Sequence, residues 1–250
     1  MFYLGKNQLT DKTQLSSQAN HEDWANRFEL LAKSSKYPAL KAFYQAGVAA
    51  ASTPISDVPM VALDFETTGL DSNRDSIVSI GLVDMTLTRI RCADARHWIV
   101  KPETKLHHRS VVVHGITHSA VADAPDFSTV VDELLFRLQG KIVIVHHSPI
   151  ERGFLNVALK RLIHEGIEFP VIDTMALEAR FSRKINHSLW RSLMGRQKTS
   201  IRLTDSRTRY HLPYYRQHNA LTDALACAEL LQAQCATHLM PDTPLNTIWS

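Results

Sequence analysis

Cysteine is scarce in this sequence: the 250 residues include three, at positions 92, 227 and 235. So sparse and odd a set excludes a disulfide scaffold and predicts a reducing compartment, which we expect to be the cytoplasm. Glycine and proline are also few, with 9 and 10 residues, whereas 44% of the chain is hydrophobic. This composition excludes a collagen-like or wholly disordered chain and predicts one that buries a sizeable core.

Long apolar runs are absent as well. No run approaches the roughly 20 residues that a membrane-spanning helix needs. The first twenty residues are polar and lack the apolar stretch of a secretory signal. The sequence therefore predicts neither a membrane partner nor secretion.

Acidic residues are nearly missing from residues 180–218, which contain ten Lys or Arg and one acid, Asp205. This segment carries +9 in a chain whose net charge is +3. The aromatic side chains interleaved with the charges are Trp190, Tyr210, Tyr214 and Tyr215. Such a pattern is typical of surfaces that bind single-stranded nucleic acid, and we expect Arg207, Arg209 and Arg216 to bind phosphates. A solvated basic loop without a ligand is the alternative.

Residues 1–58 are expected to form a helical extension followed by a linker. Asn20 has the character of a helix N-cap, and apolar residues recur at helical spacing from Trp24. Pro38 starts a second short helix and Gly47 ends it. We interpret this extension as a packing element; docking of a protein partner on its helices is the alternative.

A different pattern of alternating elements fills residues 59–240. The predicted strands are 60–65, 76–85, 90–100, 142–145 and 171–172, and the predicted helices are 127–138, 151–164, 173–181 and 219–239. Three strands followed by alternating helices and strands indicate an α/β fold, with a mixed β-sheet flanked by helices. Residues 241–250 remain as a short tail.

Two acids, Asp64 and Glu66, lie two positions apart on the first predicted strand. The strand period of two places both carboxylates on one face and the apolar residues between them on the other. Neighbouring carboxylates repel each other unless a cation joins them, and hard divalent cations such as Mg²⁺ prefer carboxylate oxygens. The pair predicts a metal site, with a solvated strand end as the alternative.

Two further motifs accompany these acids: His114-Gly115-Ile116-Thr117, and His218 five residues before Asp223 at the start of a helix. Together with the run from Asp64 to Leu70, they resemble the DEDDh 3′–5′ exonucleases. That family includes ribonuclease T and the epsilon subunit of bacterial DNA polymerase III. The resemblance covers about residues 59–238 and implies a ribonuclease H-like fold.

The resemblance implies a site with two divalent cations, Mg²⁺ or Mn²⁺. Asp64, Glu66 and Asp223 match three of the four family acids that bind them, and His218 matches the general base that activates water. An unperturbed imidazole has a pKa near 6.5, which suits that role at neutral pH.

The third motif departs from the family pattern His-Asn-Ala-x-Phe-Asp. Here residues 146–151 read His-His-Ser-Pro-Ile-Glu, so Glu151 occupies the position of the metal-binding Asp and His147 that of the Asn. We expect Glu151 to be the fourth ligand. A glutamate that merely interacts with a helix dipole is the alternative.

The resemblance also implies the residues that contact the terminal nucleotide. Thr67, Thr68, Gly69 and Leu70 would form one wall, with Leu70 beside a base. His114 and Ile116 would form the other wall, and His147, at the position of the family's Asn, is also expected to bind substrate. An ordinary turn and a helix N-cap are the structural alternatives.

These observations favour a metal-dependent exonuclease that shortens single-stranded DNA or RNA from the 3′ end and releases nucleoside 5′-monophosphates. A nucleic-acid-binding or polymerase-associated module with weak or no catalysis is the alternative, since the third acid has changed. A phosphoesterase for short oligonucleotides is disfavoured by the +9 segment. Few residues follow the last predicted helix, which disfavours a replicative proofreading role.

Overall fold

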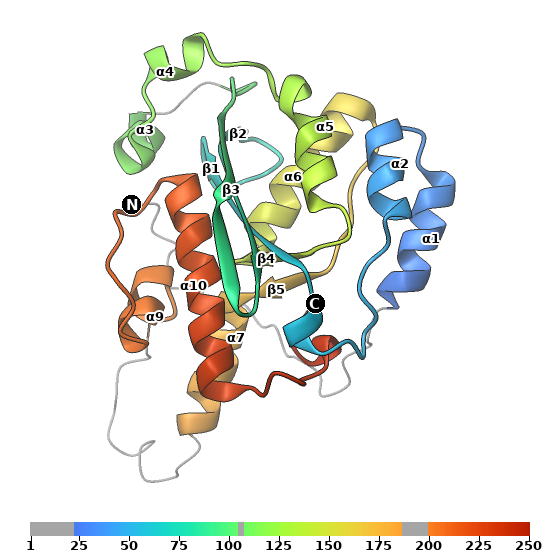
Figure 1. Ribbon diagram of the computed structural model, residues 1–250. Helices are drawn as coiled ribbons and strands as arrows, with labels where there is room; N and C mark the ends of the chain where they lie inside the picture. The colour runs from blue at the N-terminus through green and yellow to red at the C-terminus, as the bar shows by residue number, and fades with distance from the viewer. Residues whose placement is uncertain (1–22, 105–107, 187–199) are drawn as a thin grey trace.

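A mixed five-stranded sheet forms the centre of the computed structural model, which describes residues 23–104, 108–186 and 200–250. The strand order is β3-β2-β1-β4-β5 (Figure 1). The strands are β1 (Met60–Thr67), β2 (Ile77–Thr86), β3 (Arg89–Ile99), β4 (Ile142–Val145) and β5 (Val171–Asp173). The first three pair antiparallel, whereas β4 and β5 continue parallel to β1. The predicted α/β architecture with a mixed sheet is confirmed.

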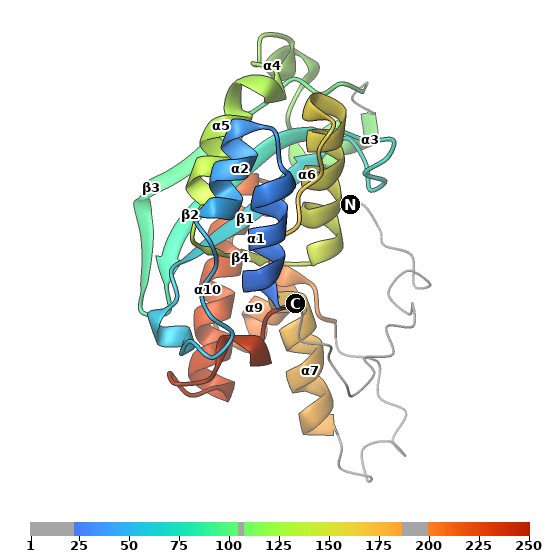
Figure 2. The same cartoon turned by 90° about the vertical axis from the view of Figure 1, so that its right-hand side faces the viewer.

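Helices cover both faces of the sheet. One face carries α5 (Phe127–Leu138) and α6 (Ser148–Ile163), with α1 (Trp24–Ser34) and α2 (Pro38–Gln45) packed outside them (Figure 2). The other face carries α7 (Thr174–Asn186) and α10 (Ala220–His238). The short elements are α3 (His108–His114), α4 (His118–Ala122), α9 (Leu203–Arg209), η1 (Ile55–Asp57) and η2 (Leu245–Thr247).

Strand β1 divides the core in two because its side chains alternate between the faces. Val61, Leu63 and Phe65 join the core beneath α5 and α6. Met60 and Ala62 join the second core beneath α7 and α10. Asp64 and Glu66 continue the series of Met60 and Ala62 along the strand, so they lie on the same face and point toward the start of α10.

The N-terminal helices belong to the first core. Phe28, Phe43 and Tyr44 are buried, and their ring centroids lie 5.2–5.3 Å apart. The side chain of Asp23 accepts a hydrogen bond from Asn26 N and caps α1. The expected cap, Asn20, lies outside the described residues.

Residues 241–250 are held by hydrogen bonds to β5 and to the linker before β1. Ser250 N donates to Val171 O at 2.9 Å, and Leu245 N donates to Thr53 O at 3.0 Å. Leu245 and Ile248 are buried in the second core. Residues 241–250 are thus packed against the fold. Within the described ranges, none of the helices combines the length and apolar character that crossing a membrane requires.

Several elements differ from the sequence-based expectation: β1 continues to Thr67 and α7 to Asn186, beyond the expected ends at 65 and 181. Helix α6 begins at Ser148, three residues earlier than expected, because Pro149 fits its first turn. The helices α3 and α9 were not anticipated, and α4 was foreseen only by the N-cap alternative, since pieces this short contain little hydrophobic periodicity.

Candidate active site

The candidate site begins where β1 leaves the second core. Asp64 and Glu66 follow Met60 and Ala62 on the face toward α10, and Glu66 is 8% exposed. The β1–β2 register shifts between Glu66 and Thr67, so regular pairing ends beside these carboxylates. The strand thereby presents two acids at the rim of the core.

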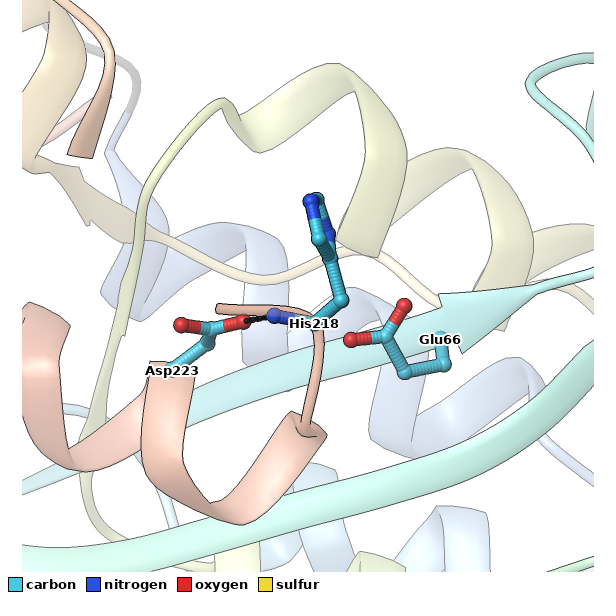
Figure 3. A group of neighbouring side chains, drawn as sticks. All are labelled: Glu66, His218 and Asp223. Atoms are coloured by element: carbon cyan, nitrogen blue, oxygen red, sulfur yellow. Dashed lines mark hydrogen bonds between the residues drawn. The ribbon is translucent and has the colours of Figure 1, made fainter. Parts of the chain in front are cut away.

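The start of α10 brings His218 and Asp223 to the same place. Asn219 caps the helix by accepting a hydrogen bond from Thr222 N, and His218 N donates to Asp223 Oδ2 at 2.7 Å. His218 has φ +66°, a left-handed conformation that turns the chain into the helix. Potential ligand atoms of Glu66, His218 and Asp223 lie within 4.8 Å of one another (Figure 3). The structure thus unites motifs that are more than 150 residues apart in the sequence.

Gly81 lets α10 approach this closely, and the sequence analysis missed it. Gly81 pairs with Asp64 across β1 and β2. A Cβ at Gly81 would lie 2.2 Å from the carbonyl atoms of Ala220, the first residue of α10. An isolated glycine inside a strand is a signal of such close backbone approach.

Glu151 completes the set from the first turn of α6. It is 2% exposed, and its Oε2 atom has no hydrogen-bond partner in the described part of the chain. Its charge acts on Asp64, so the two carboxyl groups are neighbours. Asp173 fixes the beginning of α6 by accepting hydrogen bonds from His147 N (3.2 Å) and Ser148 N (2.8 Å).

The four carboxyl groups share an environment that disfavours negative charge. Burial and then the charges of Asp223, Glu66 and Glu151 raise the pKa of Asp64 well above its usual value. Burial and Asp223 raise the pKa of Glu66 to about 8. Burial raises the pKa of Asp223 to about 6, although the N–H groups of His218 and Asn219 oppose this effect. Acids arranged in this way favour the binding of a cation.

The His114 motif lies beside this cluster. Burial and the charge of His218 lower the pKa of His114, which indicates that the two imidazoles are close. His114 Nδ1 accepts a hydrogen bond from Ile116 N at 3.0 Å, and Nε2 is buried without a partner in the described ranges. Thr117 caps α4, as the N-cap alternative expected.

Two residues expected to contact the terminal nucleotide make hydrogen bonds within the turn at the end of β1. Thr67 donates to Gly69 O, and Thr68 donates to Asp75 Oδ1 at 3.2 Å while remaining fully buried. These two hydroxyl groups therefore hold the turn together, and the expected contact of residues 67–70 with the terminal nucleotide stays a prediction. Leu70 is 38% exposed and available at its edge.

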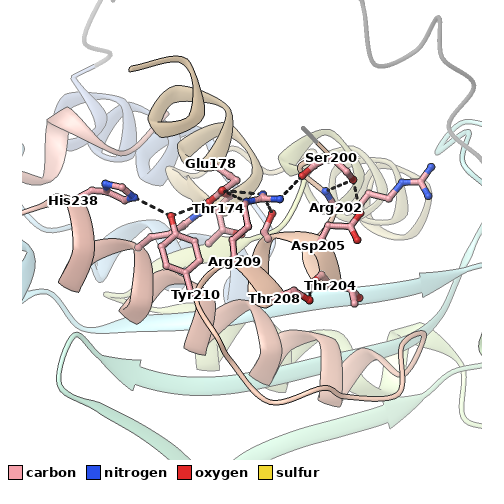
Figure 4. Close-up of polar contacts among 12 residues, drawn as sticks. Thr174, Glu178, Ser200, Arg202, Thr204, Asp205, Thr208, Arg209, Tyr210 and His238 are labelled. Carbon is pink, nitrogen blue, oxygen red and sulfur yellow. Dashed lines mark hydrogen bonds and ion pairs between the residues drawn. The ribbon is translucent and has the colours of Figure 1, made fainter. Parts of the chain in front are cut away.

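Arg207 and Arg209 both donate to groups within the fold. Arg209 is 32% exposed, but its three guanidinium nitrogens donate to Glu178, Ser200 O and Ser206. The side chain of Arg207 is 5% exposed and lies 2.7 Å from Glu229, so it is not accessible to a phosphate. Arg209 pairs with buried Glu178 at 2.8 Å, in a network that includes Tyr210 (Figure 4). We therefore correct the phosphate-binding role expected for both. Arg216 is exposed, and His147 is half-buried beside the start of α6. Residues 187–199 of the basic segment lie outside the described ranges.

Comparisons with known proteins agree with the geometry. The model of the exonuclease family RNase_T matches residues 61–231. The PolC-type DNA polymerase III of Thermotoga petrophila is 31% identical over 171 residues, which are 68% of this chain and 11% of that protein. A DNA polymerase III subunit epsilon-like protein of Rhodobacter capsulatus is 32% identical over 183 residues, 72% of this chain and 24% of that protein. The chain thus spans a quarter or less of the length of these relatives.

The solved structures agree on the fold. The nuclease domain of 3′hExo, described as a DEDDh family member bound to rAMP, superposes with a TM-score of 0.58 at 18% identity. That alignment covers 72% of this chain and 92% of the other. The family match over residues 61–231, more than half of the chain, shows that this chain belongs to the RNase_T exonuclease family.

Proposed function

We propose that this chain is a metal-dependent 3′–5′ exonuclease that hydrolyses single-stranded nucleic acid and releases nucleoside 5′-monophosphates. The observation that carries the proposal is the approach of Glu66, His218 and Asp223, whose potential ligand atoms lie within 4.8 Å of one another. Asp64 adjoins this cluster, because the charges of Glu66, Asp223 and Glu151 all act on it. These acids come from β1, α6 and α10, elements that the fold holds rigidly against one another.

The residues present fit divalent cations. Four carboxyl groups supply oxygen donors only, and the unpartnered Oε2 of buried Glu151 would find a partner in a cation. Asp64, Glu66, Asp223 and Glu151 would hold two ions, Mg²⁺ or Mn²⁺. When bound, such ions polarise the phosphate, lower the pKa of water and stabilise the leaving oxygen.

His218 is placed to act as the general base. Burial lowers its pKa, so the imidazole is neutral and able to accept a proton at neutral pH. The hydrogen bond between His218 and Asp223 uses the backbone N–H of His218 and not its imidazole (Figure 3). His218 would take a proton from the attacking water as the water oxygen bonds to phosphorus. The P–O3′ bond to the penultimate nucleotide then breaks, and the leaving 3′ oxygen takes a proton from solvent.

The 3′ end would be received between the two motifs that flank the acids. Leu70 supplies an exposed apolar side chain on one side, and half-buried Ile116 supplies one on the other. The upstream strand would continue along the basic segment, where Arg216 and Tyr214 are exposed. A charge with an adjacent ring suits phosphates and bases without sequence preference.

A 5′-labelled single strand tests this function. Wild-type protein, the His218→Ala variant and a chelator control would be incubated with DNA and with RNA in Mg²⁺ or Mn²⁺. We expect a ladder that shortens from the 3′ end, is abolished by the chelator, and slows about 10² to 10⁴-fold in His218→Ala. Shortening from the 5′ end or internal cleavage would contradict the assigned direction.

The same assay decides between the enzyme and a binding module. A wild-type protein that binds the strand in both metals but leaves it intact would favour the module, with Glu151 as the change that impaired catalysis. Docking of a protein partner on the N-terminal helices, association with a polymerase and a cytoplasmic location stay predictions.

A further inference from the structure

The guanidinium of Arg207 lies buried between α9 and α10 and donates to three acceptors. Arg207 NH1 lies 2.7 Å from Ala226 O, and NH2 lies 2.9 Å from Pro213 O and 2.7 Å from Glu229 Oε2. Two of these acceptors belong to α10, whereas Pro213 belongs to the segment that joins the helices. A planar guanidinium can donate to acceptors on two different elements at once, because its N–H groups have fixed directions.

A second residue of the joining segment packs on the same group. The carbon of the Arg207 guanidinium lies 4.6 Å from the centroid of the Tyr215 ring. The Tyr215 hydroxyl donates to Glu229 Oε1 at 2.9 Å. Arg207, Glu229 and Tyr215 thus form a closed set that ties the segment to α10.

The same segment ends at the candidate base. Residues 210–218 lie between α9 and α10 without regular secondary structure, and Leu212 N donates to Arg207 O at 3.1 Å. Three residues after Tyr215, the chain reaches His218 in its left-handed conformation. The position of His218 therefore depends on how firmly residues 212–215 are held.

We propose that Arg207 is a positioning residue that braces residues 210–218 and so places His218 against Glu66 and Asp223. The inference rests on the proposed function for the catalytic role of His218. A displacement of about 1 Å at a reacting group can cost on the order of 10²-fold in rate. Arg207 would thus affect the chemical step without touching substrate.

Arg209 provides a matched control on the same helix. Its guanidinium also pairs with a glutamate, Glu178, at 2.8 Å, but this pair joins α9 to α7 (Figure 4). Arg207→Met and Arg209→Met each remove one internal ion pair and one positive charge. They differ in whether the contacts to Pro213 and Tyr215 are lost.

The experiment compares both variants with wild type in three measurements. These are kcat and KM on a labelled single strand, the salt dependence of strand binding, and amide hydrogen exchange over residues 212–218, which lie beyond the Arg209–Glu178–Tyr210 network. For Arg207→Met we expect kcat to fall about 10 to 10²-fold, a salt slope unchanged from wild type, and faster exchange in the segment. For Arg209→Met we expect kcat within about twofold of wild type and unchanged exchange there.

Three results would overturn the proposal, two with the arginine variants and one with a substitution of Tyr215. Equal changes in kcat and exchange for the two variants would mean that Arg207 only supports general stability. A flatter salt slope for Arg207→Met with unchanged kcat would mean that it contacts phosphate. If Arg207→Met does not fold, Tyr215→Phe removes the hydroxyl contact to Glu229 alone. It should lower kcat and speed exchange in the same segment, and wild-type values for both would reject the brace.

The exchange measurement separates this inference from the proposed function. A wild-type protein without exonuclease activity would refute the function, yet faster exchange in Arg207→Met alone would still establish the brace.

Discussion

Four carboxyl groups crowd one edge of the sheet, and their repulsion is the main physical fact at the residue scale. Asp64 feels the charges of Asp223, Glu66 and Glu151, and burial adds to their effect. Without a cation, ionised acids at this density destabilise the fold. A bound cation attracts these carboxylates and so stabilises the fold instead. Metal affinity and folding stability are therefore linked at this site.

Asp64→Asn tests this linkage. The amide keeps the shape but removes the central charge, so activity should fall more than 10²-fold, on the scale of lost transition-state stabilisation. Stability in a chelator should equal or exceed that of wild type. At a concentration of Mn²⁺ a hundredfold above Kd, wild type should gain about 2.7 kcal/mol and the variant much less. Thermal unfolding with and without Mn²⁺ measures the stability that the ion adds to wild type and to the variant. An equal increase in both proteins would mean that Asp64 is not a ligand.

Glu151 is where the chain departs from its family, and two substitutions separate its roles. Glu151→Gln loses the charge that holds a divalent cation and should be severely impaired, whereas Glu151→Asp restores the family acid and should retain substantial activity. Its shorter reach should change the ratio of kcat in Mg²⁺ to kcat in Mn²⁺, because Mg²⁺ demands near-ideal octahedral geometry. Fully active Glu151→Gln would show that Glu151 serves only the start of α6.

At the scale of elements, the site depends on how closely α10 approaches β2. Gly81 permits the contact, since any side chain there would meet the backbone of Ala220. The acid on α10 and those on β1 can therefore share a cation only while position 81 lacks a Cβ.

Gly81→Ala should push α10 away from the sheet. We expect a stability loss of about 1–3 kcal/mol from overpacking and a fall in kcat of about 10²-fold from the displacement of Asp223. Gly153→Ala is the control, because its methyl group would meet only the Ser72 hydroxyl at 3.3 Å. Denaturant unfolding and kcat for both variants check this, and identical behaviour would refute the role of Gly81.

The sequence predicted some features of these elements and missed others. Strand alternation placed Asp64 and Glu66 on one face, and the resemblance to a known exonuclease family assigned them to one site with the motif at α10. The internal pairs of Arg207 and Thr68 were not predicted, since their partners lie in space rather than at a fixed spacing. A cluster of charges in a sequence does not reveal which of them the fold uses for itself.

At the scale of the whole molecule, the N-terminal helices are part of the first core. Phe28 is buried against Phe43 and Tyr44, and the same core continues to β1 and α5. The sequence predicted these two helices from their apolar spacing. It did not predict the surface on which they pack, because residues more than 80 positions away, such as Leu134, form that surface.

Phe28→Ala should therefore destabilise the entire molecule by about 3–5 kcal/mol, the usual cost of removing a buried aromatic ring. Leu30→Ala, on the same helix but 51% exposed, should change stability by less than about 0.5 kcal/mol. Denaturant unfolding monitored by circular dichroism compares them. Equal, small losses would mean that the helices add little to the core.

The central claim is that Asp64, Glu66, Glu151 and Asp223 form one divalent-cation site, and calorimetric titration with Mn²⁺ tests it most directly. Wild type and Asp94→Asn, which changes an exposed acid on β3, should bind Mn²⁺ with the same stoichiometry and affinity. Asp223→Asn should lose at least one ion or weaken binding more than tenfold. Indistinguishable binding curves for Asp223→Asn and wild type would contradict the account.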